Sequence, residues 1–316
     1  MGVLCMKRIK KIIVALSLIL LIGGIGVSSL VGIFFYNLVI NANYSKDIVY
    51  ADHYGDKLRN DEKWLEEESN YTESYIESYD NLNLHAYIVN QNNSTDKWAI
   101  VVHGYAGNGK LMSAKAKYFY EMGYNVLIPD LRGHGKSEGD YIGMGWKDRL
   151  DIISWIDFII KNNSNSKIVL HGTSMGAATV LMASGENLPS NVKAIIADCA
   201  YTSVWDEFSY ELETYLNLPS SYVLNVTNIV TKLKAGYSFK EASALDAVKK
   251  STVPILYIHG DSDKFVPYSM MDKLYNATKS QKKKLTVEDA EHANSHLMAP
   301  YLYWLTINDF LEKYVN

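Results

Sequence analysis

The stretch IVLHGTSMGAATV, residues 168–180, decides the fold. A largely β-branched run leads into GTSMG at residues 172–176, and small and apolar residues then recur at helical spacing. This order predicts a strand, a sharp turn with Ser174 at its apex, and a helix, which is the layout of a nucleophile elbow. The glycines have a steric purpose, because the turn strains the serine backbone and strand and helix cross closely there.

The pentapeptide taken alone is a weak indication. A G-x-S-x-G pattern arises by chance in roughly one chain in ten of this length. A serine that caps a helix after a strand is the plain alternative. The rest of the chain therefore has to decide between a nucleophile and a helix cap.

Length and composition indicate a globular protein with a substantial core. The chain has 316 residues, 48% of them hydrophobic and 21% charged, which suits one large α/β domain or two small ones. The net charge is −4, and because the first eleven residues contain four basic residues and no acidic one, the remainder carries −8. This balance gives no electrostatic footprint for nucleic acid. The basic run at residues 282–284 is expected to be a solvated turn before a strand.

The two cysteines, Cys5 and Cys199, indicate neither a disulfide framework nor a metal site. Cys199 follows an apolar run deep in the chain, so we expect it to be a small buried hydrophobic residue. No motif suggests a cofactor.

The N-terminal region contains a long uncharged segment. Residues 12–45 carry no charge, and a helix of about 20 apolar residues spans a bilayer core, so residues 1–45 are predicted to be a membrane anchor. Basic residues before it and mainly acidic ones after it predict a cytoplasmic N-terminus, with the bulk of the protein on the outer side of the cell membrane. A secretory signal, cleaved near the small residues at 23–29 to leave a secreted protein, is the alternative. We expect the domain to be soluble and active without residues 1–45.

The remaining chain predicts an α/β fold with a doubly wound, mostly parallel sheet. Residues 46–71 are polar and acidic and are expected to be a linker, with a short helix around Trp64 and Leu65 resting on the domain. Apolar and polar residues alternate along residues 72–89, which predicts a hairpin that turns at residues 80–81. Strands are then expected at residues 98–102, 125–128, 168–170, 194–197, 255–258 and 285–287, with helices at about 112–122, 146–160 and 299–314. Ligands of such sheets bind beyond the carboxyl ends of the strands.

Candidate reacting side chains follow the last two predicted strands. HGDSDKFVP at residues 259–267 and EDAEHANSH at residues 288–296 place an acid and a histidine after Ser174 in chain order. A serine hydroxyl becomes a good nucleophile when an imidazole takes its proton and a carboxylate holds that imidazole in the required tautomer.

Together these stretches resemble the motifs of α/β-hydrolases of the serine esterase and lipase group. They are similar to those of membrane-anchored bacterial hydrolases related to the prolyl-oligopeptidase catalytic domain. The matching stretches are HGY at residues 103–105, DLRGHG at 130–135, GTSMG at 172–176, HGDSD at 259–263 with VP at 266–267, and EHA at 291–293. The resemblance implies an α/β-hydrolase domain over residues 72–316 that works without a metal.

The resemblance also implies roles for individual residues. Ser174 is the nucleophile, Asp263 the acid and His292 the base. Asp261 competes as the acid, but the acid of the family lies three residues before Val-Pro, which selects Asp263. His296, four residues past His292, competes as the base.

Charge that develops on a tetrahedral intermediate needs preset donors. The backbone N–H of Met175, directly after the nucleophile, is expected to supply one, and that of Tyr105, in preference to Gly104, the other. The remaining histidines at strand ends are expected to be hydrogen-bonded structural residues; they are His103, His134, His171 and His259.

Residues 198–253 form a connection longer than a compact sheet needs. In the family resembled, such an insertion forms a small helical cap over the active site, here at about residues 199–252. Its many aromatic side chains suit a hydrophobic acyl or aromatic ester group, or they simply pack the cap onto the body.

The sequence thus predicts a serine hydrolase that cleaves a small-molecule or lipid ester through an acyl-enzyme. Peptide or amide cleavage of the prolyl-oligopeptidase type is the alternative among enzymes, because the triad serves both reactions. A non-catalytic binding module with the same fold is the alternative from another class, and the presence of nucleophile, acid and base argues against it.

Overall fold

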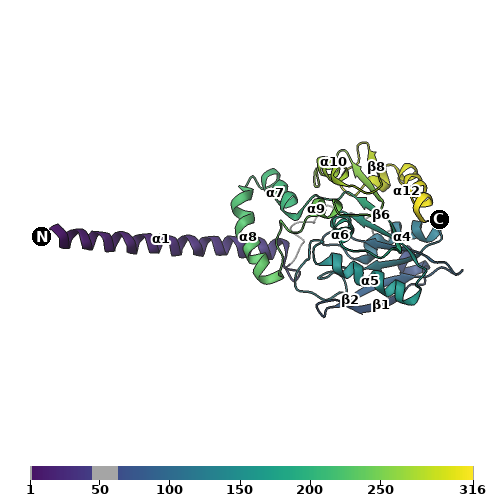
Figure 1. The fold of residues 1–316 in the computed structure, drawn as a ribbon, viewed down its shortest axis with the longest axis horizontal. Helices are drawn as coiled ribbons and strands as arrows, with labels where there is room; N and C mark the ends of the chain where they lie inside the picture. Colours follow the sequence, from purple (N-terminus) through teal and green to yellow (C-terminus); the bar gives the residue numbers. More distant parts are fainter. Residues whose placement is uncertain (1, 45–62, 316) are drawn as a thin grey trace.

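The computed structural model describes residues 2–44 and 63–315, so most of the expected linker at 46–71 lies outside the described residues. The described chain forms one sheet of eight strands with helices on both faces (Figure 1). The strands are β1 (Thr72–Glu77), β2 (Asn83–Val89), β3 (Lys97–Val102), β4 (Asn125–Pro129), β5 (Lys167–Thr173), β6 (Val192–Asp198), β7 (Ile255–Gly260) and β8 (Lys282–Val287). Their order is β1-β2-β4-β3-β5-β6-β7-β8.

The predicted mostly parallel sheet after a hairpin is confirmed. β1 pairs antiparallel with β2 and β2 antiparallel with β4, while every other neighbouring pair is parallel. The central strands are buried on both faces: along β3, Ile100 and Val102 join one hydrophobic cluster, and Ala99 and Val101 join the other. Such two-sided burial explains why these strands read as continuous apolar runs.

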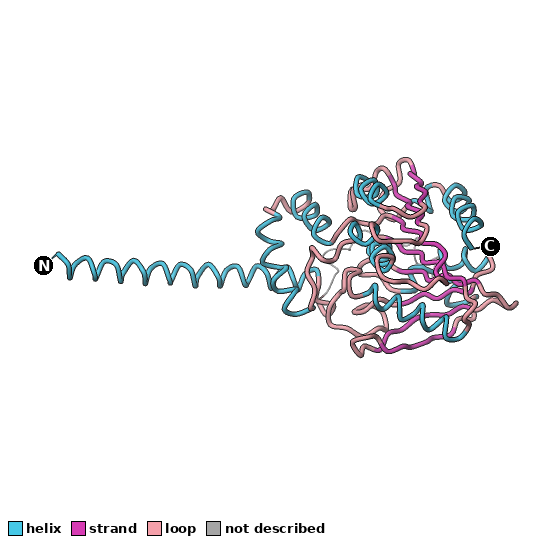
Figure 2. Tube along the Cα trace, in the orientation of Figure 1, coloured by secondary structure: helices cyan, strands magenta, loops and turns pink. Residues whose placement is uncertain are grey.

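Two layers of helices cover the sheet (Figure 2). One face is covered by η1 (Trp64–Glu68), α4 (Ser113–Glu121) and α12 (Pro300–Val315), and the other by α5 (Asp148–Asn162), α6 (Met175–Ala183), α9 (Ala244–Val248) and α10 (Tyr268–Ala277). The short η2 (Gly109–Met112) and α11 (Ser295–Met298) lie within connections. Trp64 and Leu65 of η1 are buried, as expected for a segment that rests on the domain.

The basic run at residues 282–284 was expected to be a turn, and this expectation is wrong. Lys282 to Lys284 form the first half of β8 and pair in register with residues 255–257 of β7. β8 is the edge of the sheet, where lysine side chains can reach solvent and discourage pairing with another chain.

The long connection between β6 and β7 is helical. It contains α7 (Val204–Thr214), α8 (Ser220–Ala235) and the short α9, and we call α7 and α8 the cap. Ser203 caps α7 by accepting from the N–H of Asp206, and Gly236 ends α8 with a left-handed φ of 72°. The cap lies at the end of the body from which the N-terminal helix projects (Figure 1).

The N-terminal helix α1 (Gly2–Val39) contains a stretch, Leu16–Val39, long and apolar enough to cross a membrane, with a mean hydropathy of 2.4. Leu20 and Leu30 are 77% and 71% exposed, so this stretch has no apolar partner in the described chain for much of its length. The last turns differ, because Tyr36 and Ile40 are 4% and 0% exposed and belong to the main core.

The end of α1 packs against α8 of the cap. A Cβ on Gly32 would lie 2.7 Å from the carbonyl oxygen of Val226, so only glycine allows the two helices to approach this closely. The segment expected as a separate anchor is therefore continuous with the folded body.

Candidate active site

Ser174 occupies the turn between β5 and α6 in a strained backbone conformation, with φ 56° and ψ −119°. A Cβ on Gly172 would lie 2.2 Å from the carbonyl oxygen of Gly176, and one on Gly176 would lie 2.3 Å from that of Val102. The glycines on either side of the serine are thus required by the crossing of strand and helix. This turn lifts the serine side chain above the carboxyl ends of the strands.

The three side chains expected to react form one hydrogen-bonded chain. His292, in the loop after β8, has Nε2 2.9 Å from Ser174 Oγ. Its Nδ1 lies 2.7 Å from Oδ2 of Asp263, in the loop after β7. With Nδ1–H donating to the carboxylate, Nε2 is free to accept the serine proton.

Asp263 is held as a carboxylate by several donors. The backbone N–H groups of Phe265 and Val266 each donate to its Oδ1 at 2.9 Å, and His259 Nε2 lies 3.1 Å from its Oδ2. Burial alone would raise the pKa of Asp263, but the hydrogen bonds from His259 and His292 outweigh it and lower the pKa to about 2. His259, expected only as a structural residue, therefore also supports the acid.

The competing acid and base lie elsewhere. Asp261 is exposed and its Oδ1 accepts from the backbone N–H of Asp289 at 2.8 Å. Burial lowers the pKa of His296 to about 3, and its ring lies against that of Tyr303, with centroids 6.0 Å apart. Within the described part of the chain, no hydrogen bond joins His296 to Ser174.

One expected oxyanion donor, Met175, directly follows the serine, and the loop that carries the other passes beside it. Met175 is the first residue of α6, so its N–H has no carbonyl acceptor within the helix. The loop after β3 passes close by, because a Cβ on Gly104 would lie 3.4 Å from the Cβ of Ser174. The choice of the Tyr105 N–H over that of Gly104 stays a prediction.

Histidines shape this loop, as expected. His103 Nε2 accepts from the N–H of Leu131 at 3.0 Å, and His134 Nε2 accepts from the N–H of Ala106 at 3.2 Å. Both rings are buried and lie edge to face with centroids 5.0 Å apart. These hydrogen bonds hold the loop after β3 beside the serine.

A buried ionic group beneath the elbow was not found by sequence reasoning. Lys115 Nζ donates to Oδ2 of Asp198 at 3.0 Å, and the Tyr303 hydroxyl donates to the same oxygen at 3.0 Å while it lies 3.0 Å from His171 Nε2. Burial would raise the pKa of Asp198, but Lys115 outweighs it and lowers the pKa. The backbone carbonyl of Asp198 accepts from the N–H of Ser174 at 2.8 Å, which links this group to the nucleophile.

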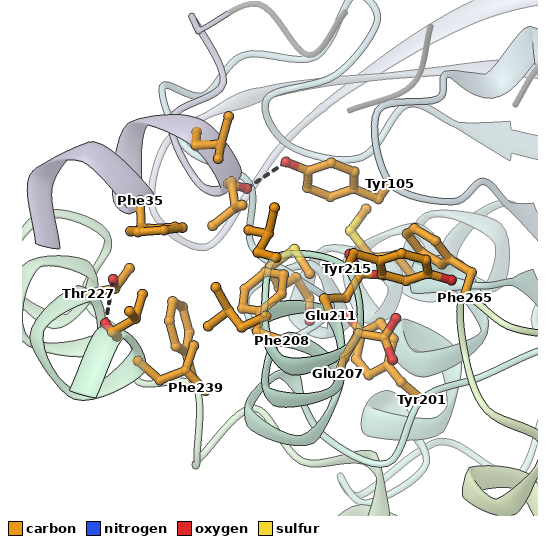
Figure 3. Close-up of a pocket in the computed structure, with 18 of the residues that line it drawn as sticks. Phe35, Tyr105, Tyr201, Glu207, Phe208, Glu211, Tyr215, Thr227, Phe239 and Phe265 are labelled. Atoms are coloured by element: carbon orange, nitrogen blue, oxygen red, sulfur yellow. Dashed lines mark hydrogen bonds between the residues drawn. The ribbon is translucent and has the colours of Figure 1, made fainter. Parts of the chain in front are cut away.

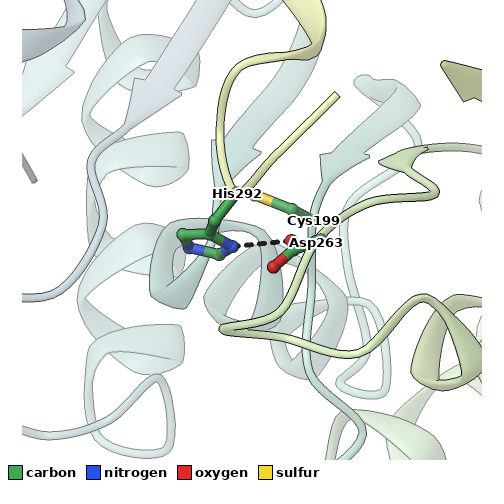
Figure 4. Close-up of side chains that lie close together, drawn as sticks. All are labelled: Cys199, Asp263 and His292. Carbon is green, nitrogen blue, oxygen red and sulfur yellow. Dashed lines mark hydrogen bonds and ion pairs between the residues drawn. The ribbon is translucent and has the colours of Figure 1, made fainter. Parts of the chain in front are cut away.

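Cys199, Asp263 and His292 bring possible metal-ligand atoms within 4.8 Å of one another (Figure 4). The thiolate is the form that binds a metal, yet burial raises the pKa of Cys199 well above its ordinary value. The facing atoms of the other two side chains are already hydrogen bonded to each other. The donor set fits a hydrogen-bonded acid and histidine backed by a buried thiol.

A cavity of about 380 Å³ opens above the serine, between the body, the cap and α1 (Figure 3). Ser174 and Met175 form part of its wall. The body adds Tyr105, Met144, Tyr201, Phe239 and Phe265, the cap adds Glu207, Phe208, Glu211, Leu212, Val223, Leu224 and Thr227, the loop between α7 and α8 adds Tyr215 and Leu216, and α1 adds Phe35, Leu38 and Val39. The wall is thus mostly apolar, and the aromatic residues of the insertion line it in part.

The contribution of α1 was missed because a helix that is apolar all round indicates a membrane span and hides a face that packs on the body. Phe35 and Leu38 carry no sequence signal that separates them from the other apolar residues of the segment.

Comparisons with known proteins agree with this fold. A family model for the alpha/beta hydrolase fold matches residues 98–236. The uncharacterized protein YqkD of Bacillus subtilis is 29% identical over 272 residues, which cover 81% of this chain and 88% of YqkD. The esterase Pf2001 of Pyrococcus furiosus is 24% identical, covers 80% of this chain and 95% of its own, and superposes with a TM-score of 0.64. Est1E of Butyrivibrio proteoclasticus, solved with bound ferulic acid, is 23% identical and has a TM-score of 0.58. The match covers 76% of this chain and 98% of the Est1E chain.

Proposed function

We propose that this chain, which has the α/β-hydrolase fold, is a serine hydrolase that cleaves carboxylic esters through an acyl-enzyme. The observation that carries the proposal is the chain of hydrogen bonds from Ser174 Oγ to His292 and on to Asp263, at 2.9 and 2.7 Å. The esterases among the structural neighbours support the choice of ester over other bonds.

The proposed reaction has two halves. Ser174 Oγ attacks the ester carbonyl carbon while His292 takes its proton, and the N–H groups of Met175 and Tyr105 stabilise the oxyanion. The tetrahedral intermediate collapses, the alcohol leaves with the proton from His292, and the acyl group stays on the serine. Water then attacks the acyl-enzyme with His292 again as the base, and the acid is released. Asp263, charged throughout, stabilises the imidazolium in both halves.

The cavity supports an apolar acyl or aryl group in the substrate. Its aromatic and aliphatic side chains give up water readily, and its volume of about 380 Å³ suits a medium-sized organic ligand. Amide bonds can be cleaved by the same triad, so an amide analogue belongs in any test of specificity.

We also propose that α1 is retained as a membrane anchor with a cytoplasmic N-terminus. Residues 12–31 would span roughly 30 Å as a helix, the thickness of a bilayer core. The hydroxyl of Tyr222, a residue of the cap that is 45% exposed, is 2.9 Å from Ser28 Oγ. The cap therefore lies next to this apolar stretch. N-terminal sequencing of the membrane-bound protein tests retention: a start at residue 1 or 2 supports the anchor, and a start between residues 24 and 30 would establish a cleaved signal.

The first experiment is labelling of the full-length protein in detergent with a fluorophosphonate probe. Wild type should be labelled and should hydrolyse p-nitrophenyl esters, whereas Ser174→Ala should lose both while remaining folded. Ser190→Ala, an exposed serine outside the cavity, is the matched control and should behave as wild type. Undiminished labelling of Ser174→Ala would overturn the proposal.

A further inference from the structure

Two glutamates of α7 line the cavity. Glu207 and Glu211 lie on successive turns of α7, and both face the cavity that Ser174 opens into (Figure 3). Glu207 is only 4% exposed. Within the described residues, neither of its carboxyl oxygens has a hydrogen-bond partner, and neither does Oε1 of Glu211. Buried polar groups are normally satisfied, so these oxygens need an explanation.

The surroundings of the pair are acidic. The charged groups that act on Glu207 are Glu211, Asp263 and Asp206, all of which raise its pKa in addition to burial, the largest cause. Burial raises the pKa of Glu211 to about 7. Two carboxyl groups that lie close together in a buried wall are costly to desolvate, and they repel each other when ionised. Their position in the wall therefore destabilises the folded protein.

The pair lies near the reacting centre rather than at the α1 end of the cavity. In Figure 3, Glu207 and Glu211 are drawn close to Tyr201 and Phe265, with Phe35 at the far side. The ring of Phe265 lies against that of His292, with centroids 4.9 Å apart. A ligand group that reaches the pair therefore lies in the same cavity as an ester carbonyl held at the serine.

We propose that Glu207 and Glu211 form a cation subsite that binds an ammonium group of the substrate close to the scissile ester. This inference rests on the proposed function and names its substrate class: an ester whose apolar part fills the cavity and which carries a protonated amine. A bound ammonium favours the ionised form of the carboxyl groups and so opposes the effect of burial on them, and its N–H groups donate charge-assisted hydrogen bonds to the unpartnered oxygens. The aromatic faces nearby are also favourable surroundings for a cation.

Two pairs of esters of nearly equal shape test the subsite on either side of the scissile bond. Dimethylaminoethyl octanoate and isopentyl octanoate differ by the charged nitrogen in the alcohol, and the methyl ester of α-aminooctanoic acid and methyl octanoate differ by an ammonium in the acyl part. In one pair, kcat/KM should be about tenfold or more higher for the cationic ester, the range of a charge-assisted hydrogen bond. Equal values in both pairs would overturn the subsite.

Variants on one helix assign the effect to the carboxyl groups. In the double variant Glu207→Gln with Glu211→Gln, the ratio of kcat/KM between cationic and neutral ester should fall to about one, whatever happens to each value separately. Glu213→Gln, an exposed glutamate on α7 outside the cavity, should keep the wild-type ratio. A ratio that persists in the double variant would show that the preference arises elsewhere.

A binding measurement separates failure of the subsite from failure of the proposed function. Butylammonium chloride should raise the Tm of Ser174→Ala more than butanol does at equal concentration, and the two Gln substitutions should remove this difference. If no ester is hydrolysed but the ammonium effect is present, the proposed function falls and the subsite stands. If esters are hydrolysed through Ser174 without any ammonium effect or cationic preference, the subsite falls and the proposed function stands.

Discussion

The phenol of Tyr105 donates a hydrogen bond of 2.8 Å to the backbone carbonyl of Val39. This bond joins the loop beside the nucleophile to the last residue of α1. Two further backbone contacts hold the same region, because the N–H of Ile142 donates to the carbonyl of Ile40 at 2.7 Å and Asn41 pairs with Tyr141. The end of the apolar helix is thus part of the framework of the site, and its position bears directly on the serine.

A chain that begins at residue 46 should be less stable and less active than one that begins at residue 31. The shorter chain loses Tyr36 and Ile40 from the core, and removing a large buried side chain costs about 2–5 kcal/mol. Urea unfolding and ester turnover of both chains in detergent measure the difference. Equal stability and turnover of the two chains would contradict this prediction and favour the expectation that the domain is soluble and active without residues 1–45.

Leu38→Trp should shorten the preferred acyl chain, because a larger side chain in the wall reduces the length of cavity available. Hydrolysis of p-nitrophenyl esters from acetate to palmitate gives the profile, and its maximum should move to shorter chains. Leu30→Trp makes the same change at a 71% exposed position of α1 outside the cavity and should leave the profile unchanged. An unaltered profile for Leu38→Trp would mean that the acyl group does not reach α1.

Asp263→Asn should leave a folded enzyme with kcat lower by about three to four orders of magnitude, because an amide can present the wrong partner to Nδ1 of His292 and cannot stabilise the imidazolium. Asp261→Asn, two residues away and exposed, should lose little. Single-turnover kinetics with p-nitrophenyl acetate compare the two. A larger loss of kcat for Asp261→Asn than for Asp263→Asn would show that Asp261, and not Asp263, is the acid.

Glu211→Gln should change the pH dependence of stability. Burial raises the folded pKa of Glu211 from 4.5 to about 7. Because this acid binds its proton more tightly when folded, its contribution is fully present below about pH 4.5 and is lost as the pH rises through about 7. The variant should therefore lose less stability than wild type between pH 4.5 and 8, by up to about 3 kcal/mol. Urea unfolding across this range measures it; parallel curves for variant and wild type would contradict the assigned shift.

Lys115→Met should destabilise the protein by about 3–5 kcal/mol, because it leaves the carboxylate of Asp198 buried without its cation. The matched control is Lys249→Met, which breaks the exposed ion pair with Asp246 and should cost less than about 1 kcal/mol. Denaturant unfolding gives both values. A small loss for Lys115→Met would show that Asp198 is held by other groups.

Much of the site could be predicted from the sequence because its parts follow strand ends. Ser174, Asp263 and His292 each lie in the turn or loop that follows a strand, and parallel strands bring their carboxyl ends to one edge of the sheet. The choice between neighbouring candidates depended on the resemblance to a family, and the structure adds the reason: the loop after β7 turns Asp263 toward His292 and leaves Asp261 facing solvent.

Other features carry no local pattern. Lys115 lies on an ordinary helix and its partner Asp198 is eighty-three residues away, so nothing in the sequence joins them. Glu207 and Glu211 occupy the spacing of any charged helical face, and a sequence pattern predicts them to be solvated. Only the packing of α7 over the serine turns that face inward.

The sequence by itself determined the order of strands and helices, the strained serine turn and the apolar N-terminal segment, because steric and hydrophobic patterns act over a few neighbouring residues. The tertiary structure decided which wall encloses the serine, that α1 closes the cavity beside the cap, and that two glutamates of α7 face into it. These properties arise where segments far apart in the chain exclude water together, and burial of that kind exists only after the chain has folded.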